Sequence, residues 1–151
     1  MKKNILGILG LLIVIFIVTA VLNPKFLSAY NMQNLVKWSS LYAIMGVGVA
    51  FVIITGGIDL SIGSVIGLVA SLLAFTLNIK HWNPAAAIVA MLMLSVLIGL
   101  VHGLLITKVK LQPFVVTLCG LLIYRGVARW VTDNQSMGFP NQDRLDYFFS
   151  G

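Results

Sequence analysis

The stretch TGGIDLSIGS, from Thr55 to Ser64, places a glycine pair, an aspartate and two serines between two long apolar runs. The chain of 151 residues is 60% hydrophobic and only 9% charged, against roughly 25% charged in an ordinary soluble domain. In lipid, unpaired backbone amides are so costly that only helices and closed barrels span the membrane. The apolar runs are continuous and lack the alternation of barrel strands. They predict an all-α fold, a polytopic transmembrane helical bundle.

Five apolar runs are candidates for transmembrane helices, although a crossing takes about 20 residues and the second run is short for a full crossing. We expect helices at approximately residues 5–22, 41–55, 61–77, 84–107 and 114–131, in one transmembrane domain. A short interfacial helix is expected between Asn31 and Ser40, where aromatic and charged residues are mixed. The first run is longer than the core of a usual signal peptide and is followed by more spans, so we interpret it as a retained signal anchor.

The basic residues predict the orientation. Lys2, Lys3, Lys108 and Lys110 lie on one side if five helices alternate, and that side is cytoplasmic by the positive-inside rule. The polar tail, residues 132–151, is then periplasmic. The net charge of +6 comes from ten scattered Lys and Arg residues that form no stripe, so nucleic acid is not an expected partner.

The interruption at Thr55 to Ser64 predicts a broken helix. Gly56 and Gly57 allow the backbone to leave the helix, and Asp59 or Ser61 is expected to cap the next helix by accepting its free amides. Non-helical backbone persists at membrane depth only where protein or a watery cavity covers it, which favours a translocation pathway. A tight turn at the membrane surface, with a solvated Asp59, is the alternative, and the sequence leaves the depth open.

Small residues recur at helical spacing on two of the expected helices. They are Gly63, Gly67 and Ser71 on one helix, and Gly99 and Gly103 on the next. Such faces let helix backbones approach closely in membrane bundles, so we predict that these five residues serve helix packing.

Other polar residues in the apolar runs have structural explanations. His102 has no second metal-ligating residue near it in sequence, so we expect a hydrogen-bonded interior residue and no metal site. Arg125 and Arg129, one turn apart near the end of the last run, are expected to snorkel to the interface. The chain has none of the zinc-protease, nucleophile-elbow or phosphate-loop motifs. No catalytic residue, cofactor or metal is therefore predicted.

Three segments together are similar to a known family. They are NPKFLSAYNMQNL (Asn23 to Leu35), FVIITGGIDLSIGSVIGLVA (Phe51 to Ala70) and GLLITKVKLQPFVVTLCGLLIYRGVA (Gly103 to Ala128). In this order and spacing they resemble the membrane permease subunits of bacterial ribose-type carbohydrate ABC importers. The resemblance implies about ten helices in a full permease of the bacterial inner membrane. It also implies three partners: a second permease subunit, an ATP-binding subunit and a periplasmic sugar-binding protein.

By the same resemblance, Gly56, Gly57, Asp59 and Ser61 match the family's motif near the pathway, and Thr117 matches a threonine of a later motif. We assign the pathway and the helix break to the following residues: Thr55, Gly56, Gly57, Asp59, Ser61, Ser64 and Thr117. The chain departs from the family pattern at His102, where Asn is usual, and at Cys119, where Gly is common. It also stops before the family's cytoplasmic coupling loop, so we expect an N-terminal half that does not bind the ATPase by itself.

A second function, from a different class, is compatible with the residues. Five-helix units could form a self-contained secondary transporter or channel with Asp59 as the ion site. In both cases the chain is a transport protein and not an enzyme, and the sequence does not name the transported substrate.

Overall fold

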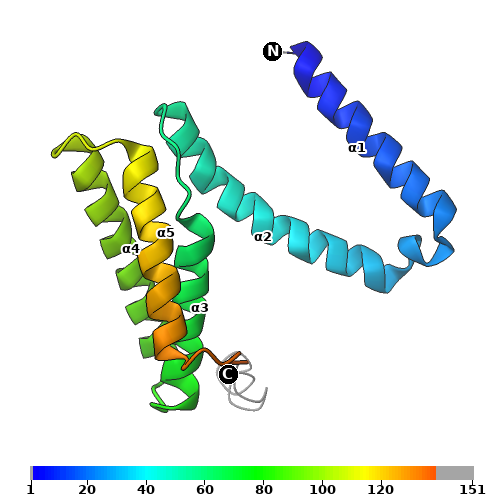
Figure 1. The fold of residues 1–151 in the computed structure, drawn as a ribbon. Helices are drawn as coiled ribbons and strands as arrows, with labels where there is room; N and C mark the ends of the chain where they lie inside the picture. Colours follow the sequence, from blue (N-terminus) through cyan, green and yellow to red (C-terminus); the bar gives the residue numbers. More distant parts are fainter. Residues whose placement is uncertain (1, 139–151) are drawn as a thin grey trace. The chain divides into compact units, whose positions relative to one another are not determined.

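The computed structural model describes residues 2–138, which form five α-helices and one short 3-10 helix. In chain order they are α1 (Lys2–Leu22), η1 (Pro24–Leu27), α2 (Ala29–Ile54), α3 (Ile62–Asn78), α4 (Pro84–Thr107) and α5 (Pro113–Val131) (Figure 1). No strand occurs within this range, which confirms the predicted all-α class. The tail was predicted to be polar and periplasmic, and its residues 139–151 lie outside the described part of the chain.

Four of these helices, α1, α2, α4 and α5, are long and apolar enough to cross a bilayer. The apolar part of α1, Ile5–Leu22, has a mean hydropathy of 3.2 and no buried residue within the described chain. A helix that is apolar all round belongs in lipid or against other membrane helices. The chain is therefore a multi-pass helical membrane protein.

Two predicted helices, the interfacial one and residues 41–55, are a single helix in the structure. α2 runs unbroken from Ala29, so no separate interfacial helix exists between Asn31 and Ser40. The reason is that no proline follows Pro24 in this region, and exposed Asn, Lys and Ser residues are tolerated within a helix. With 26 residues, α2 is about 39 Å long at 1.5 Å per residue, longer than the hydrocarbon of a bilayer.

The helices fall into two units, Met1–Phe51 and Val52–Gly151. Within the first, the chain turns at η1, where the Asn23 side chain accepts a hydrogen bond from the Lys25 amide at 3.1 Å. Asn31 then donates to the Phe26 carbonyl at 2.7 Å, and the rings of Phe16 and Phe26 meet edge to face with centroids 5.0 Å apart. These contacts hold the end of α1 and the start of α2 at the turn.

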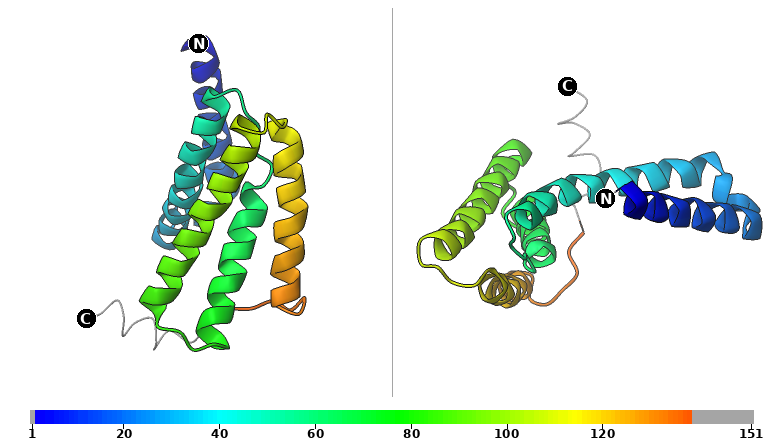
Figure 2. Two further views of the ribbon diagram at one scale, coloured as in Figure 1. Left: turned by 90° about the vertical axis from the view of Figure 1, so that its left-hand side faces the viewer. Right: turned by 90° about the horizontal axis from the view of Figure 1, so that it is seen from above.

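In the second unit, α3 packs against both α4 and α5. α3 and α5 run in the same direction and α4 runs opposite (Figure 1 and Figure 2). The buried apolar residues of the described chain all lie on these three helices: Leu68, Ala74, Leu77, Ala87, Met91 and Val116. Asn83 caps α4 by accepting from the Ala85 amide, and prolines occupy the first turns of α4 and α5, where the missing amide costs nothing.

Candidate functional site

The break between α2 and α3 begins with a glycine-dependent helix end. The Gly56 amide donates to the Ile53 carbonyl and the Gly57 amide to the Val52 carbonyl, both at 2.9 Å. Gly56 has φ of +74°, so this is a Schellman end, in which glycine is favoured at the left-handed position. A Cβ on Gly57 would lie 3.2 Å from Val52 Cγ1. The left-handed φ thus requires glycine at position 56, while a side chain at Gly57 would fit tightly against Val52.

Asp59 organises the start of α3. Its Oδ1 accepts hydrogen bonds from the amide and the hydroxyl of Ser61, both at 2.7 Å. Ser61 occupies the N-cap position, but its side chain makes no capping hydrogen bond. Its backbone is already helical, with φ of −83° and ψ of −16°, and its hydroxyl proton goes to Asp59. Asp59 thus accepts the N-cap amide at the start of α3, as one of the two predicted alternatives, whereas the Ser61 side chain accepts none of the free amides, so the other alternative is wrong.

Thr117 connects α5 to the break. Its hydroxyl lies 2.8 Å from the Pro113 carbonyl of its own helix and 3.3 Å from the carbonyl of Ile58. Both Thr117 and Ser61 are nearly inaccessible, at 2% and 1% exposure. The irregular segment is thus anchored at one end of α3 and against one face of α5.

The break lies inside the helical layer of its unit rather than at its end. Thr117 is four residues into α5, about 6 Å along the helix axis, and it contacts the carbonyl of Ile58. Asp59 lines a cavity with His102, which lies more than one turn before Thr107, the last residue of α4. The break therefore lies about one helical turn from the ends of α4 and α5, and its depth in the membrane remains a prediction.

A cavity of about 470 Å³ adjoins the break. Five of the residues assigned to the pathway line it: Thr55, Gly56, Gly57, Asp59 and Thr117. α4 contributes Gly99, His102, Gly103 and Thr107 to the same wall. Ser61 lines a smaller neighbouring cavity of about 230 Å³, in which Asp59 and His102 take part again. Ser64 does not join these residues, because it lines a separate groove between α3 and α5.

His102 is hydrogen-bonded in the interior of the unit, as predicted. Its Nε2 lies 2.8 Å from the hydroxyl of Tyr124, and the two rings are tilted with centroids 5.6 Å apart. The imidazole also lies against Gly120, where an added Cβ would come within 2.7 Å of Nε2. The partners Tyr124 and Gly120 were not predicted, since contacts between α4 and α5 leave no spacing signal in the sequence.

The glycines predicted for helix packing lie along these hollows. Gly63, Gly67 and Ser71 line the groove between α3 and α5, while Gly99 and Gly103 line the break cavity. A Cβ built on any of the four glycines would meet no atom within 4 Å. Among the described residues, the helical glycine with the closest neighbouring side chains is Gly120. The packing role of the four predicted glycines therefore remains a prediction.

The described residues contain no group of three or more His, Cys, Asp or Glu side chains that could hold a metal ion. Cys119 is exposed on α5. What the site offers chemically is a hollow lined by hydroxyl, carboxylate and imidazole groups beside exposed glycine backbone. Such a surface can exchange hydrogen bonds with a polar molecule.

A broken helix among membrane helices, with a cavity at the break that carries hydroxyl, carboxylate and imidazole groups among apolar side chains, is typical of polytopic membrane proteins that transport a solute. Residues 31–150 match the family described as branched-chain amino acid transport system / permease component. The chain belongs to this family.

Curated relatives include sugar import permeases. The ribose import permease of Escherichia coli (strain K12) is 36% identical over 142 residues, 94% of this chain and 44% of that protein. The ribose import permease of Bacillus subtilis (strain 168) is 38% identical over 125 residues, 83% of this chain and 38% of that protein. The xylose transport system permease of E. coli (strain K12) is 35% identical over 112 residues, 74% of this chain and 28% of that protein.

The chain spans less than half the length of these relatives. No solved structure matches the chain. The predicted resemblance to ribose-type permeases is confirmed by the family and by these relatives.

Proposed function

We propose that the chain is part of a permease subunit of an ATP-driven sugar importer, and that the break cavity lies on the path of the sugar. The observation that carries the proposal is the gathering of Asp59 and Thr117 with the glycine pair around one hollow. The relatives named as ribose and xylose permeases support the substrate class.

The lining of the cavity favours a neutral, hydroxyl-rich substrate. No Lys or Arg lines it, so the carboxylate of an amino acid would have no cationic partner there. The single carboxylate, Asp59, already accepts two hydrogen bonds from Ser61. A sugar needs no charged partner, and its hydroxyls can donate to exposed carbonyls and accept from threonine hydroxyls.

The proposed assembly has three partners: a second permease subunit, an ATP-binding subunit and a periplasmic sugar-binding protein. Energy would come from the ATP-binding subunit, because this chain shows no phosphate-loop motif. We place the protein in the bacterial inner membrane, with a cytoplasmic N-terminus.

The energy source separates this proposal from an ion-coupled transporter. We expect radiolabelled ribose or xylose uptake, by cells carrying the permease with its ATPase and binding protein, to stop when the ATPase is inactivated. A protonophore should leave uptake largely intact while ATP is maintained. The opposite pattern would favour Asp59 as the ion site of a secondary transporter.

The orientation gives a further prediction. α3 has only 17 residues, about 26 Å, and we expect it to complete a crossing together with the irregular segment before it. With five crossings and a cytoplasmic N-terminus, we expect Lys108 in the cytoplasm and Lys80 in the periplasm.

In a Cys119→Ala background, Lys80→Cys should react with a membrane-impermeant maleimide on intact spheroplasts. Lys108→Cys should react only after permeabilisation. Labelling of Lys108→Cys on intact spheroplasts would contradict the alternation of the five helices.

A further inference from the structure

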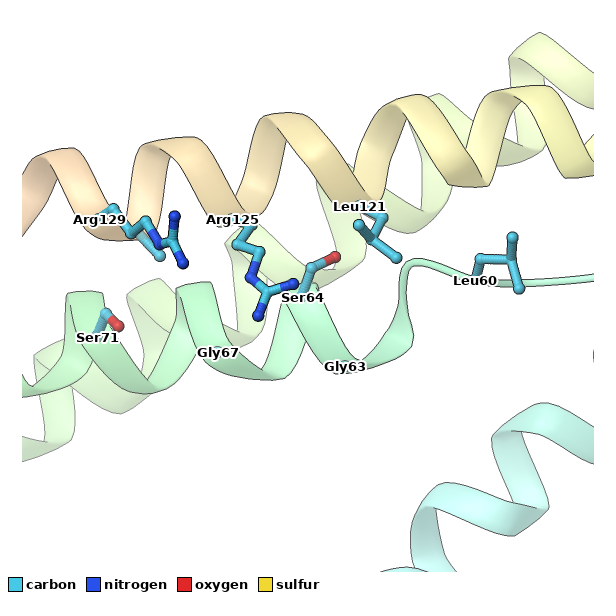
Figure 3. A pocket seen from close by; sticks show the side chains of 9 residues that line it. Leu60, Gly63, Ser64, Gly67, Ser71, Leu121, Arg125 and Arg129 are labelled. Carbon is cyan, nitrogen blue, oxygen red and sulfur yellow. The ribbon is translucent and has the colours of Figure 1, made fainter. Parts of the chain in front are cut away.

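A groove of about 390 Å³ lies between α3 and α5, separate from the break cavity. Arg125 and Arg129 extend from α5 toward α3, whose facing residues are Ser64 and Ser71 with Gly63 and Gly67 (Figure 3). The glycines leave the floor of the groove open, since a Cβ on either would meet nothing within 4 Å. The groove therefore combines free space with two guanidinium groups on one side.

The two arginines need an electrostatic partner. They lie in α5, which qualifies as a membrane span, where a cation costs several kcal/mol unless it is paired or reaches water. Among residues 2–138 the only carboxylates are Asp59 and Asp133, and neither lines the groove. The hydroxyl of Ser64 donates to the Ser61 carbonyl at 2.6 Å, so the charged donors facing the groove are the guanidinium groups.

The position of the arginines identifies the nearest abundant anion. Arg129 is in the last turn of α5 and Arg125 is one turn earlier, so the arginine end of the groove lies at the end of the span, close to the lipid headgroups, while Leu60 and Leu121 line its other end. The planar guanidinium matches the oxygens of a headgroup phosphate with two parallel hydrogen bonds.

We propose that the groove between α3 and α5 is a binding site for a phosphate group, held by Arg125 and Arg129 and supplied by an anionic phospholipid. Ordinary snorkelling would place the two guanidinium groups in bulk water and would require no groove. The site is independent of the sugar path, because it shares no residue with the lining of the break cavity.

The test is native mass spectrometry of the purified chain in a neutral detergent, titrated with dioleoyl phosphatidylglycerol. We expect the lipid to be retained, and its apparent affinity to fall at least about tenfold in Arg125→Gln/Arg129→Gln, since charge-assisted hydrogen bonds are lost. The matched control is Lys108→Gln/Lys110→Gln, which removes the same charge and should bind as the unchanged chain does.

One further variant and one further ligand complete the test. Gly67→Leu fills the groove without altering any charge and should weaken lipid binding similarly, even if the arginine variant folds poorly. Dioleoylglycerol, which lacks the phosphate, should not be retained. Equal lipid binding by Gly67→Leu or by the arginine variant would overturn the site. Arginine-dependent binding of inorganic phosphate without lipid retention would assign the groove to a soluble anion and overturn the lipid assignment.

Discussion

Replacing Gly120 by alanine should destabilise the protein clearly more than the same change at Gly126 on the same helix. The new Cβ would lie 2.7 Å from Nε2 and 2.9 Å from Cε1 of His102, and 3.0 Å from a ring carbon of Tyr124. These rings are fixed by their mutual hydrogen bond, so α4 and α5 must separate or the hydrogen bond must break. Overpacking of this kind costs about 1–3 kcal/mol.

The measurement is the midpoint of thermal unfolding in detergent, followed by circular dichroism. Gly126→Ala is the matched control, because it lies on the same helix and its added methyl meets nothing within 4 Å. It should be neutral or slightly stabilising, since alanine favours helix more than glycine does. His102→Ala should rescue Gly120→Ala in the double variant. A midpoint for Gly120→Ala equal to that of Gly126→Ala would contradict the contact.

Asp59→Leu should cause a second large loss, of folded protein and of transport together. Leucine removes the acceptor for both the amide and the hydroxyl of Ser61, a residue that is only 1% exposed. A buried donor without a partner costs about 1–3 kcal/mol. The start of α3 and the adjoining cavity wall should therefore be disordered by this one change.

Asp59→Asn distinguishes this structural role from a role of the charge. The amide oxygen of asparagine can still accept both hydrogen bonds, so the variant should keep most of the membrane abundance and most of the sugar uptake per molecule. The membrane abundance of Ser61→Ala should lie between those of Asp59→Leu and Asp59→Asn, because this variant loses the hydroxyl of residue 61 and keeps its backbone amide. Normal abundance with abolished uptake in Asp59→Asn would show that the charge itself is needed and would favour an ion-coupled mechanism.

The fold was predictable wherever composition decides the structure. Long apolar runs identify membrane helices without any knowledge of their neighbours, and prolines and glycines mark several ends, such as Pro84 and Gly56. The unbroken α2 was missed because aromatic and polar residues near Trp38 were read as interfacial. No local breaker separates them from the apolar half, and a helix longer than the bilayer accommodates both.

The site was predictable only in part. The glycine pair and Asp59 are neighbours in sequence, so their role in the break could be inferred directly. The contacts of Thr117 with Ile58 and of His102 with Tyr124 join residues 59 and 22 positions apart. Such contacts depend on how helices pack, and Thr117 was included only through the family resemblance. Ser61 was wrongly included as an alternative cap because the residue types alone do not say which side chain accepts the free amides.

The central claim is that the cavity at the helix break lies on the path of the sugar. Its most direct test is radiolabelled ribose or xylose uptake by a permease carrying Thr55→Cys in a Cys119→Ala background, measured before and after treatment with a water-soluble thiol reagent. Thr55 is exposed and lines the cavity. The account predicts that modification reduces uptake to less than about a tenth, given that a bulky charged group would block a cavity of drug-like size, and that added sugar slows the modification. Complete modification with unchanged uptake would contradict the claim.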